Sequence, residues 1–143
     1  MNTNIILTLT IIILASLAFL FRRTIFSQPE AAVLKSHLGI VAVDKNGQNI
    51  FILVPAGTEL PNVYSNIFTN ESDGQNKVEI TLCQQHPEGI EIVTNIVEKI
   101  PPNEKSTVQV VVTLMIDKKK NLRVKTTIAD TARVKEYGPF QLR

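Results

Sequence analysis

The side chains that most often carry chemistry are few in this sequence. It has two histidines, His37 and His86, and a single cysteine, Cys83. Cys83 and His86 lie three residues apart, but a tetrahedral metal site needs a second pair of ligands, and no such pair follows. We therefore interpret Cys83 as a strand-end thiol, His86 as a loop imidazole and His37 as a structural histidine, and we predict no metal site.

Catalytic and cofactor motifs are also missing from the sequence. It contains no nucleophile elbow, no cysteine-protease signature, no phosphate-binding loop and no Gly-x-Gly-x-x-Gly. Glu88 and Glu91 form a carboxylate pair, but they flank an expected turn, where solvated surface is the usual explanation. We predict that the protein is not an enzyme, has no catalytic residues, and binds neither a cofactor nor a nucleotide.

Charge gives no indication of a nucleic-acid partner. Of the 15 basic residues, two are Arg22 and Arg23, so 13 basic residues remain from position 24 onward against 13 acidic ones. Such a balance lacks the basic footprint of a nucleic-acid-binding domain. The one basic cluster, Lys118–Lys120, falls at an expected hairpin turn, and we interpret it as solvated.

The first 23 residues predict a transmembrane anchor. Residues 5–21 contain no charge, no Pro and no Gly, and as a helix they would span about 26 Å, close to the thickness of a hydrocarbon core. A cleavable signal peptide is the alternative, but no basic residue precedes the apolar run. Arg22, Arg23 and Lys35 follow it, so the positive-inside rule predicts a single-pass protein whose domain is cytoplasmic. The sequon Asn70-Glu71-Ser72 would matter only on a lumenal face.

The rest of the chain predicts short strands. We interpret residues 24–35 as a linker, 36–133 as one domain and 134–143 as an irregular tail, because Gly138-Pro139 interrupts it. Asn46-Gly47 is a strong hairpin signal. Alternating apolar residues and turn signals predict strands over 37–44, 49–54, 63–69, 77–84, 90–99, 108–116 and 122–128. The pattern is typical of an all-β antiparallel sandwich or barrel.

A series of short fragments, in this order, resembles a known family. They are Ser36–Ile40, Leu53–Pro61, Ser65–Thr69, Asp73–Gln75, Val78–Ile80 with Gln84, Ile100–Pro102, and Val108–Asp117 followed by Leu122–Val124. Together they resemble the substrate-binding β-sandwich of the seventy-kilodalton heat-shock chaperones, the DnaK family, over about residues 33–130. The resemblance implies a β-sandwich, which agrees with the six to eight short antiparallel strands that the alternation and turn signals predict.

The resemblance also implies a function and a site. The family's domain holds extended or unfolded polypeptide segments in a groove with one deep apolar pocket. By matched position, Ile40, Phe68, Val78 and Ile80 would wall that pocket, and Thr69 and Gln75 would make polar contacts near the peptide backbone. Judged from the residues alone, the four apolar side chains could equally be ordinary core.

The sequence departs from the family in ways that bear on function. Residues 41–47 form a longer first loop, and Glu71 places a charge where the family has a small residue. We expect neither the family's ATPase domain nor its helical lid in this chain, so a protein partner would have to supply either one. The sequence therefore predicts a membrane-anchored, ATP-independent module that binds unfolded segments. The alternative is an adaptor sandwich that has lost the groove and binds a fixed protein partner.

Overall fold

The computed structural model describes residues 31–44 and 47–143, and Ala32–Arg143 form one compact unit. The predicted anchor at residues 5–21 and the turn at 45–46 lie outside the described residues. Within the described part, no helix has the length and apolarity needed to cross a membrane. The eight strands are β1 (His37–Asp44), β2 (Gly47–Val54), β3 (Asn62–Thr69), β4 (Lys77–His86), β5 (Gly89–Lys99), β6 (Gln109–Ile116), β7 (Asn121–Ile128) and β8 (Arg133–Gln141).

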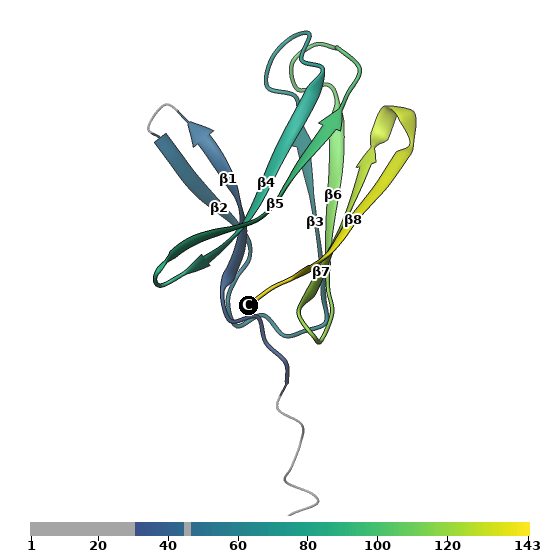
Figure 1. The fold of residues 1–143 in the computed structure, drawn as a ribbon. Coiled ribbons are helices and arrows are strands. Elements are labelled where there is room, and N and C mark those ends of the chain that lie inside the picture. The colour runs from purple at the N-terminus through teal and green to yellow at the C-terminus, as the bar shows by residue number, and fades with distance from the viewer. Residues whose placement is uncertain (1–30, 45–46) are drawn as a thin grey trace, which may run out of the picture. The chain divides into compact units, whose positions relative to one another are not determined.

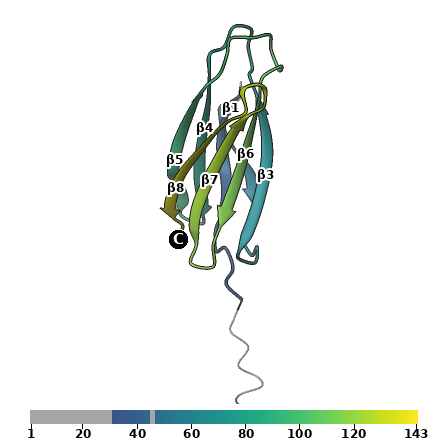
Figure 2. The same cartoon turned by 90° about the vertical axis from the view of Figure 1, so that its right-hand side faces the viewer.

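These strands form two antiparallel sheets packed face to face (Figures 1 and 2). One has the order β2-β1-β4-β5 and the other β3-β6-β7-β8. The structure thus confirms the predicted all-β antiparallel fold. The strand limits also follow the sequence closely, because strict alternation in Lys77–Leu82 and Val108–Ile116 leaves one face to bury.

The core lies between the two sheets. Leu38, Leu82 and Ile96 from the first sheet and Leu114 and Leu122 from the second are almost completely buried. Burying each such side chain stabilises a fold by about 1.5–3 kcal/mol. This apolar layer holds the two sheets at a fixed separation.

The prediction of an irregular tail is wrong. Residues 133–141 form β8, which pairs with β7 at the edge of the second sheet. The register shifts between Leu122 and Val124, opposite Gly138 and Pro139. Proline lacks a backbone N–H donor, so a strand tolerates it only at a sheet edge or at a bulge. Pro139 meets both conditions, because β8 is an edge strand and its register shifts at this point.

The prediction of a linker as far as residue 35 is also wrong at its end. The Leu34 side chain is fully buried, and its backbone N–H donates to the Thr58 carbonyl at 2.9 Å. The Leu60 N–H donates to the Ala32 carbonyl at 2.7 Å. Residues 32–35 are therefore part of the domain, docked on the loop between β2 and β3.

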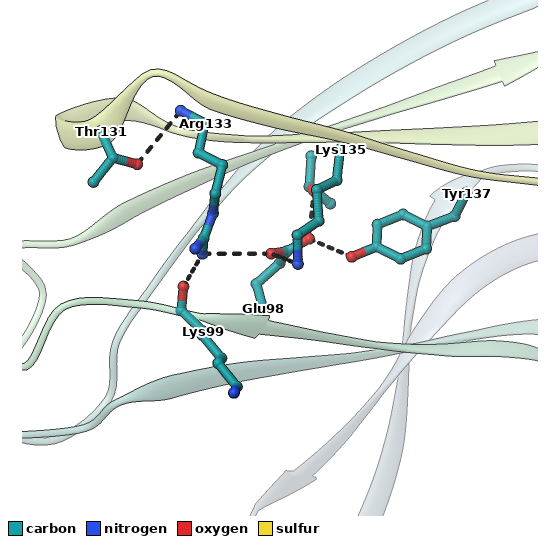
Figure 3. Close-up of polar contacts among 7 residues, drawn as sticks. Glu98, Lys99, Thr131, Arg133, Lys135 and Tyr137 are labelled. Carbon is teal, nitrogen blue, oxygen red and sulfur yellow. Dashed lines mark hydrogen bonds and ion pairs between the residues drawn. The ribbon is translucent and has the colours of Figure 1, made fainter.

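A buried carboxylate ties the two sheets together along one edge (Figure 3). Glu98 on β5 is 1% exposed, and its Oε1 accepts hydrogen bonds from Thr126 Oγ1 at 2.6 Å and Tyr137 Oη at 2.5 Å. Its Oε2 lies 3.2 Å from Lys135 Nζ and 3.8 Å from a guanidinium nitrogen of Arg133. We call these five residues the Glu98 clamp.

The clamp keeps Glu98 ionised. Desolvation by burial, the largest single influence, would raise the pKa of Glu98, but the hydrogen bonds from Thr126, Tyr137 and Lys135 and the charge of Lys135 together lower it below its usual value. Burial and the neighbouring carboxylate raise the pKa of Tyr137 to about 12. The clamp is thus a charged tie whose strength depends on an ionised Glu98 and a protonated Tyr137.

Candidate functional site

The first sheet divides partway along β1. β1 pairs with β2 over Leu38–Asp44, but with β4 only over His37–Ile40, where the last pair is Ile40 with Leu82. Beyond that pair, the β1–β2 hairpin leans away from β4 and β5 (Figure 1). Among the described strands, Lys77–Thr81 of β4 then pair only with β5. We call this divergence the fork.

Local irregularities explain where the fork lies. The register shifts between Leu38 and Gly39 in the β1–β2 pair, and between Leu82 and Cys83 in the β4–β5 pair. Such bulges bend a strand and increase its twist. Gly39 contributes a second cause, because a Cβ at this position would lie 2.6 Å from the Phe51 carbonyl oxygen. Only glycine allows β2 to approach β1 so closely at the fork.

A hollow of about 640 Å³ opens beside the fork, and we call it the fork cleft. It is walled by β1, the end of β3, the first half of β4 and the loop between β3 and β4. Its lining residues are Ile40, Val41, Phe68, Thr69, Glu71, Gly74, Gln75, Asn76, Lys77, Val78, Glu79 and Thr81. Apolar and polar groups thus meet at one concave surface.

Five of the six residues predicted from the family resemblance line this cleft: Ile40, Phe68, Thr69, Gln75 and Val78. Phe68 and Ile40 are half-buried and pack against the core, and Thr69 is exposed at the end of β3. Val78, 6% exposed, belongs both to the cleft wall and to the core, whereas the sixth residue, Ile80, is 3% exposed and belongs to the core between the sheets. The structure therefore brings together residues that are up to 38 positions apart in the chain.

The amide of Gln75 is already engaged within its own loop. Its Oε1 accepts hydrogen bonds from the backbone N–H groups of Glu71 at 2.8 Å and Ser72 at 3.3 Å. Its Nε2 donates to the Lys77 carbonyl at 2.5 Å. Gln75 thus shapes the wall of the cleft, and any contact with a ligand would add to this structural role.

The rim of the cleft is charged. Of its charged residues, the resemblance to the DnaK family had indicated only Glu71. Lys77 and Glu79 point outward from β4 and form an ion pair, with Lys77 Nζ 2.5 Å from Glu79 Oε1. Glu71 is exposed on the facing loop. The alternation of Lys77–Leu82 predicts that Lys77 and Glu79 lie on the outer face of the strand. The sequence does not show that this outer face borders a cleft.

A second polar cluster lies where the chain enters β1. Ser36 Oγ is 2.6 Å from His86 Nδ1, and His86 Nε2 is 3.4 Å from Glu91 Oε2, which is 3.3 Å from Arg143 Nε. The order of groups is that of a nucleophile, a base and an acid. However, Ser36 is only 6% exposed, so we interpret the cluster as a tie between the start of β1 and the β4–β5 hairpin. His86, predicted in a loop, is the last residue of β4.

Neither Cys83 nor a group of metal-ligating side chains adds another candidate site in the part of the chain that the structure describes. Cys83 is fully buried, and burial raises the pKa of its thiol, which disfavours the reactive thiolate. Within residues 31–44 and 47–143, no three His, Cys, Asp or Glu side chains are grouped so that they could hold a metal ion.

Comparison with known proteins adds no family assignment. No protein-family model matches the sequence, and no curated protein matches it either.

Proposed function

We propose that this protein is a membrane-anchored, ATP-independent module that binds extended or unfolded polypeptide segments in the fork cleft. The observation that carries the proposal is the cleft itself, which combines an apolar lining with strand segments that have separated from each other. The resemblance to the DnaK substrate-binding domain supports the same site, since five of the six residues that it implies for peptide binding line the cleft.

The backbone at the fork suits an extended ligand. Successive residues of a strand direct their N–H and C=O groups to opposite sides. About half of the residues in Lys77–Thr81 therefore present these groups toward the side that β1 has left. An unfolded segment also carries unpaired backbone groups, and strand addition is a common way for a sheet to bind one. Hydrogen bonding to this edge would be independent of the ligand's sequence.

The apolar wall would supply side-chain preference. Ile40, Phe68 and Val78 line the cleft next to the fork, and Val78 is only 6% exposed. A Leu-sized side chain inserted here would displace water from the exposed parts of Ile40 and Phe68 and contact the small exposed part of Val78. Each fully buried aliphatic side chain contributes about 1.5–3 kcal/mol, so one anchor and a few backbone bonds would give weak, reversible binding.

The anchor and the mode of binding complete the proposal. Residues 5–21 would hold the domain at a membrane, and Arg22 and Arg23 favour a cytoplasmic location. As an ATP-independent module it would bind at equilibrium, and the direct contacts in the cleft would set how fast a segment dissociates. A protein partner that supplied an ATPase or a lid would change the kinetics of the same site.

Glu71 favours a second candidate, an adaptor that binds one fixed protein partner. This carboxylate lies on the cleft wall, and covering it with an apolar segment would remove water from a charge, which is costly without a cation opposite. A fixed partner with a basic residue at that point would remove the cost. The two candidates differ in how broadly the cleft accepts ligands.

Titration with a peptide tests the proposal. The full chain in detergent micelles is titrated with a fluorescent, Leu-rich extended peptide, using wild type, Val78→Phe and Val63→Phe. The first variant adds bulk where the cleft wall meets the core, because Val78 is nearly buried, and should abolish binding. The second makes the same change at an exposed position of β3 outside the cleft and should leave binding unchanged. Failure of the wild type to bind, or equal binding by both variants, would overturn the proposal in favour of the adaptor.

A further inference from the structure

Asn70 is a fully buried polar residue at the start of the loop that walls the fork cleft. Its Nδ2 donates to the carbonyl oxygens of Glu104 at 2.7 Å and Ser72 at 3.2 Å, and lies 3.5 Å from that of Asn103. Its Oδ1 accepts a hydrogen bond from the Val108 N–H at 3.0 Å. One amide thus bonds to backbone groups of two loops, including that of the last residue before β6.

Further bonds join the same two loops, which connect β3 to β4 and β5 to β6. The Ser106 N–H donates to the Asn70 carbonyl at 2.9 Å, and the Gly74 N–H donates to the Asn103 carbonyl at 2.9 Å. Asp73 Oδ1 accepts from the Lys105 N–H at 2.7 Å. Both loops lie at the end of the sandwich away from Arg143 (Figures 1 and 2). The β5–β6 loop therefore supports the β3–β4 loop along much of its length.

The two faces of the β3–β4 loop have different roles. Glu71, Gly74, Gln75 and Asn76 line the fork cleft, whereas Asn70, Asp73 and the Gly74 N–H bond to the β5–β6 loop. From this arrangement, and resting on the proposed function, we infer that Asn70 is a positioning residue for peptide binding. Asn70 holds the β3–β4 loop against the β5–β6 loop and so sets the width of the fork cleft, without touching the ligand.

Only a side chain with both a donor and an acceptor fits this position. Aspartate would keep the bond from the Val108 N–H but would face the carbonyls of Ser72 and Glu104 with a buried negative charge. Alanine would remove the acceptor of the buried Val108 N–H. The carbonyls of Ser72, Asn103 and Glu104 would lose one donor each and keep the backbone N–H groups of Gln75, Gly74 and Thr107. The same amide nitrogen is the acceptor atom of the Asn70-Glu71-Ser72 sequon, so a glycan at Asn70 is incompatible with this loop arrangement.

The test compares the full-length wild type with Asn70→Ala, Asp73→Ala and Leu122→Val. Leu122 is buried at the other end of the core, beside the β6–β7 turn, so its variant lowers stability without touching either loop. Two quantities are measured: the Kd for the Leu-rich peptide, and hydrogen exchange of the amides of residues 71–76 against those of β6 and β7. We expect Asn70→Ala to raise the Kd by about tenfold, the equivalent of losing one net hydrogen bond, and to speed exchange in 71–76 selectively.

The controls separate positioning from general destabilisation. Asp73→Ala removes one exposed bond to the β5–β6 loop and should shift both quantities in the same direction by less. Leu122→Val should change neither the Kd nor exchange in 71–76. Unchanged loop exchange in Asn70→Ala, or an equal rise in Kd in Leu122→Val, would overturn the inference. If the wild type binds no peptide, the proposed function fails, while loop exchange still decides whether Asn70 holds the loop.

Discussion

The two sides of the first sheet differ in how their strands are held. On the β5 side, the Glu98 clamp reaches across to β7 and β8 of the second sheet (Figure 3). On the β1–β2 side, the sheet divides at Ile40 and Leu82 and the fork cleft opens. The proposed binding site therefore lies on the divided side of the sheet.

The comparison also shows how polar groups are used differently. In the clamp, a buried charge is fully surrounded by donors and cations, so it stabilises a single arrangement. At the cleft, Lys77, Glu79 and Glu71 are exposed and contribute little to stability. We therefore expect mutations at the clamp to change stability and mutations at the cleft to change binding.

The largest effect should follow from removing the clamp's carboxylate. Glu98→Ala leaves the hydroxyls of Thr126 and Tyr137 without their acceptor and is expected to lower the free energy of unfolding by about 2–4 kcal/mol. Urea denaturation measures this loss, and Glu136→Ala, an exposed β8 carboxylate 3.6 Å from Arg123, is the control with an effect below about 0.5 kcal/mol. Similar losses in both variants would show that the clamp is not a tie.

A matched pair of glycines tests the two sides directly. A Cβ at Gly138 on β8 would lie 2.7 Å from the Leu122 carbonyl oxygen, and at Gly39 2.6 Å from that of Phe51. Each Gly→Ala change should cost about 1–3 kcal/mol, with the greater loss at Gly138, whose φ of +102° also disfavours alanine. Only Gly39→Ala should weaken peptide binding, since it displaces β2 at the fork. A loss of binding in both variants would remove the distinction between the two sides.

Acid should release the clamp. Because the pKa of Glu98 is lowered in the folded protein, its contribution to stability is complete above the usual pKa of a glutamate and is lost as the pH falls through the lowered value. The stability difference between wild type and Glu98→Gln, measured by urea denaturation, should therefore narrow as the pH is lowered below about 4.5. A difference that stays constant with pH would contradict a charged clamp.

Alkali should act on the same clamp through its tyrosine. The pKa of Tyr137 is raised to about 12, so its contribution is complete below about pH 10, where the unfolded tyrosine titrates, and is lost as the pH rises toward 12. Wild type should lose stability relative to Tyr137→Phe over this interval. Parallel curves for the two proteins would show that the phenol makes no linked contribution.

The smallest effect is expected at the cleft rim. Breaking the Lys77–Glu79 pair with Lys77→Ala should change the free energy of unfolding by less than about 0.5 kcal/mol, because both side chains are exposed and screened by salt. The affinity for an acidic peptide should fall more than the affinity for a neutral one, as read by the same fluorescence titration. A loss of stability in Lys77→Ala as large as that in Glu98→Ala would show that the cleft rim stabilises the fold as much as the clamp does.

Much of the fold could be predicted because the pattern of burial is local. The alternation in Lys77–Leu82 and Val108–Ile116 has one interpretation, since a period of two leaves one face to bury. The strand at 133–141 could not be recognised, because Gly138-Pro139 is compatible with a strand only at an edge, and position in a sheet is not encoded locally. The burial of Leu34 could not be predicted for a related reason, since its partner Thr58 follows only after the whole β1–β2 hairpin.

The site divides in the same way between sequence and structure. The sequence by itself determined which side chains are apolar and which strands most of them occupy. The resemblance predicted that six residues lie together, of which Ile40, Phe68, Thr69, Gln75 and Val78 line the fork cleft. Only the tertiary structure decided that β1 leaves β4 at Ile40, that Ile80 is core, and that Asn70 and Glu98 are buried ties. The physical reason is that strand pairing and the packing of one sheet on the other bring residues that are distant in sequence into contact. Both depend on the whole chain folding together.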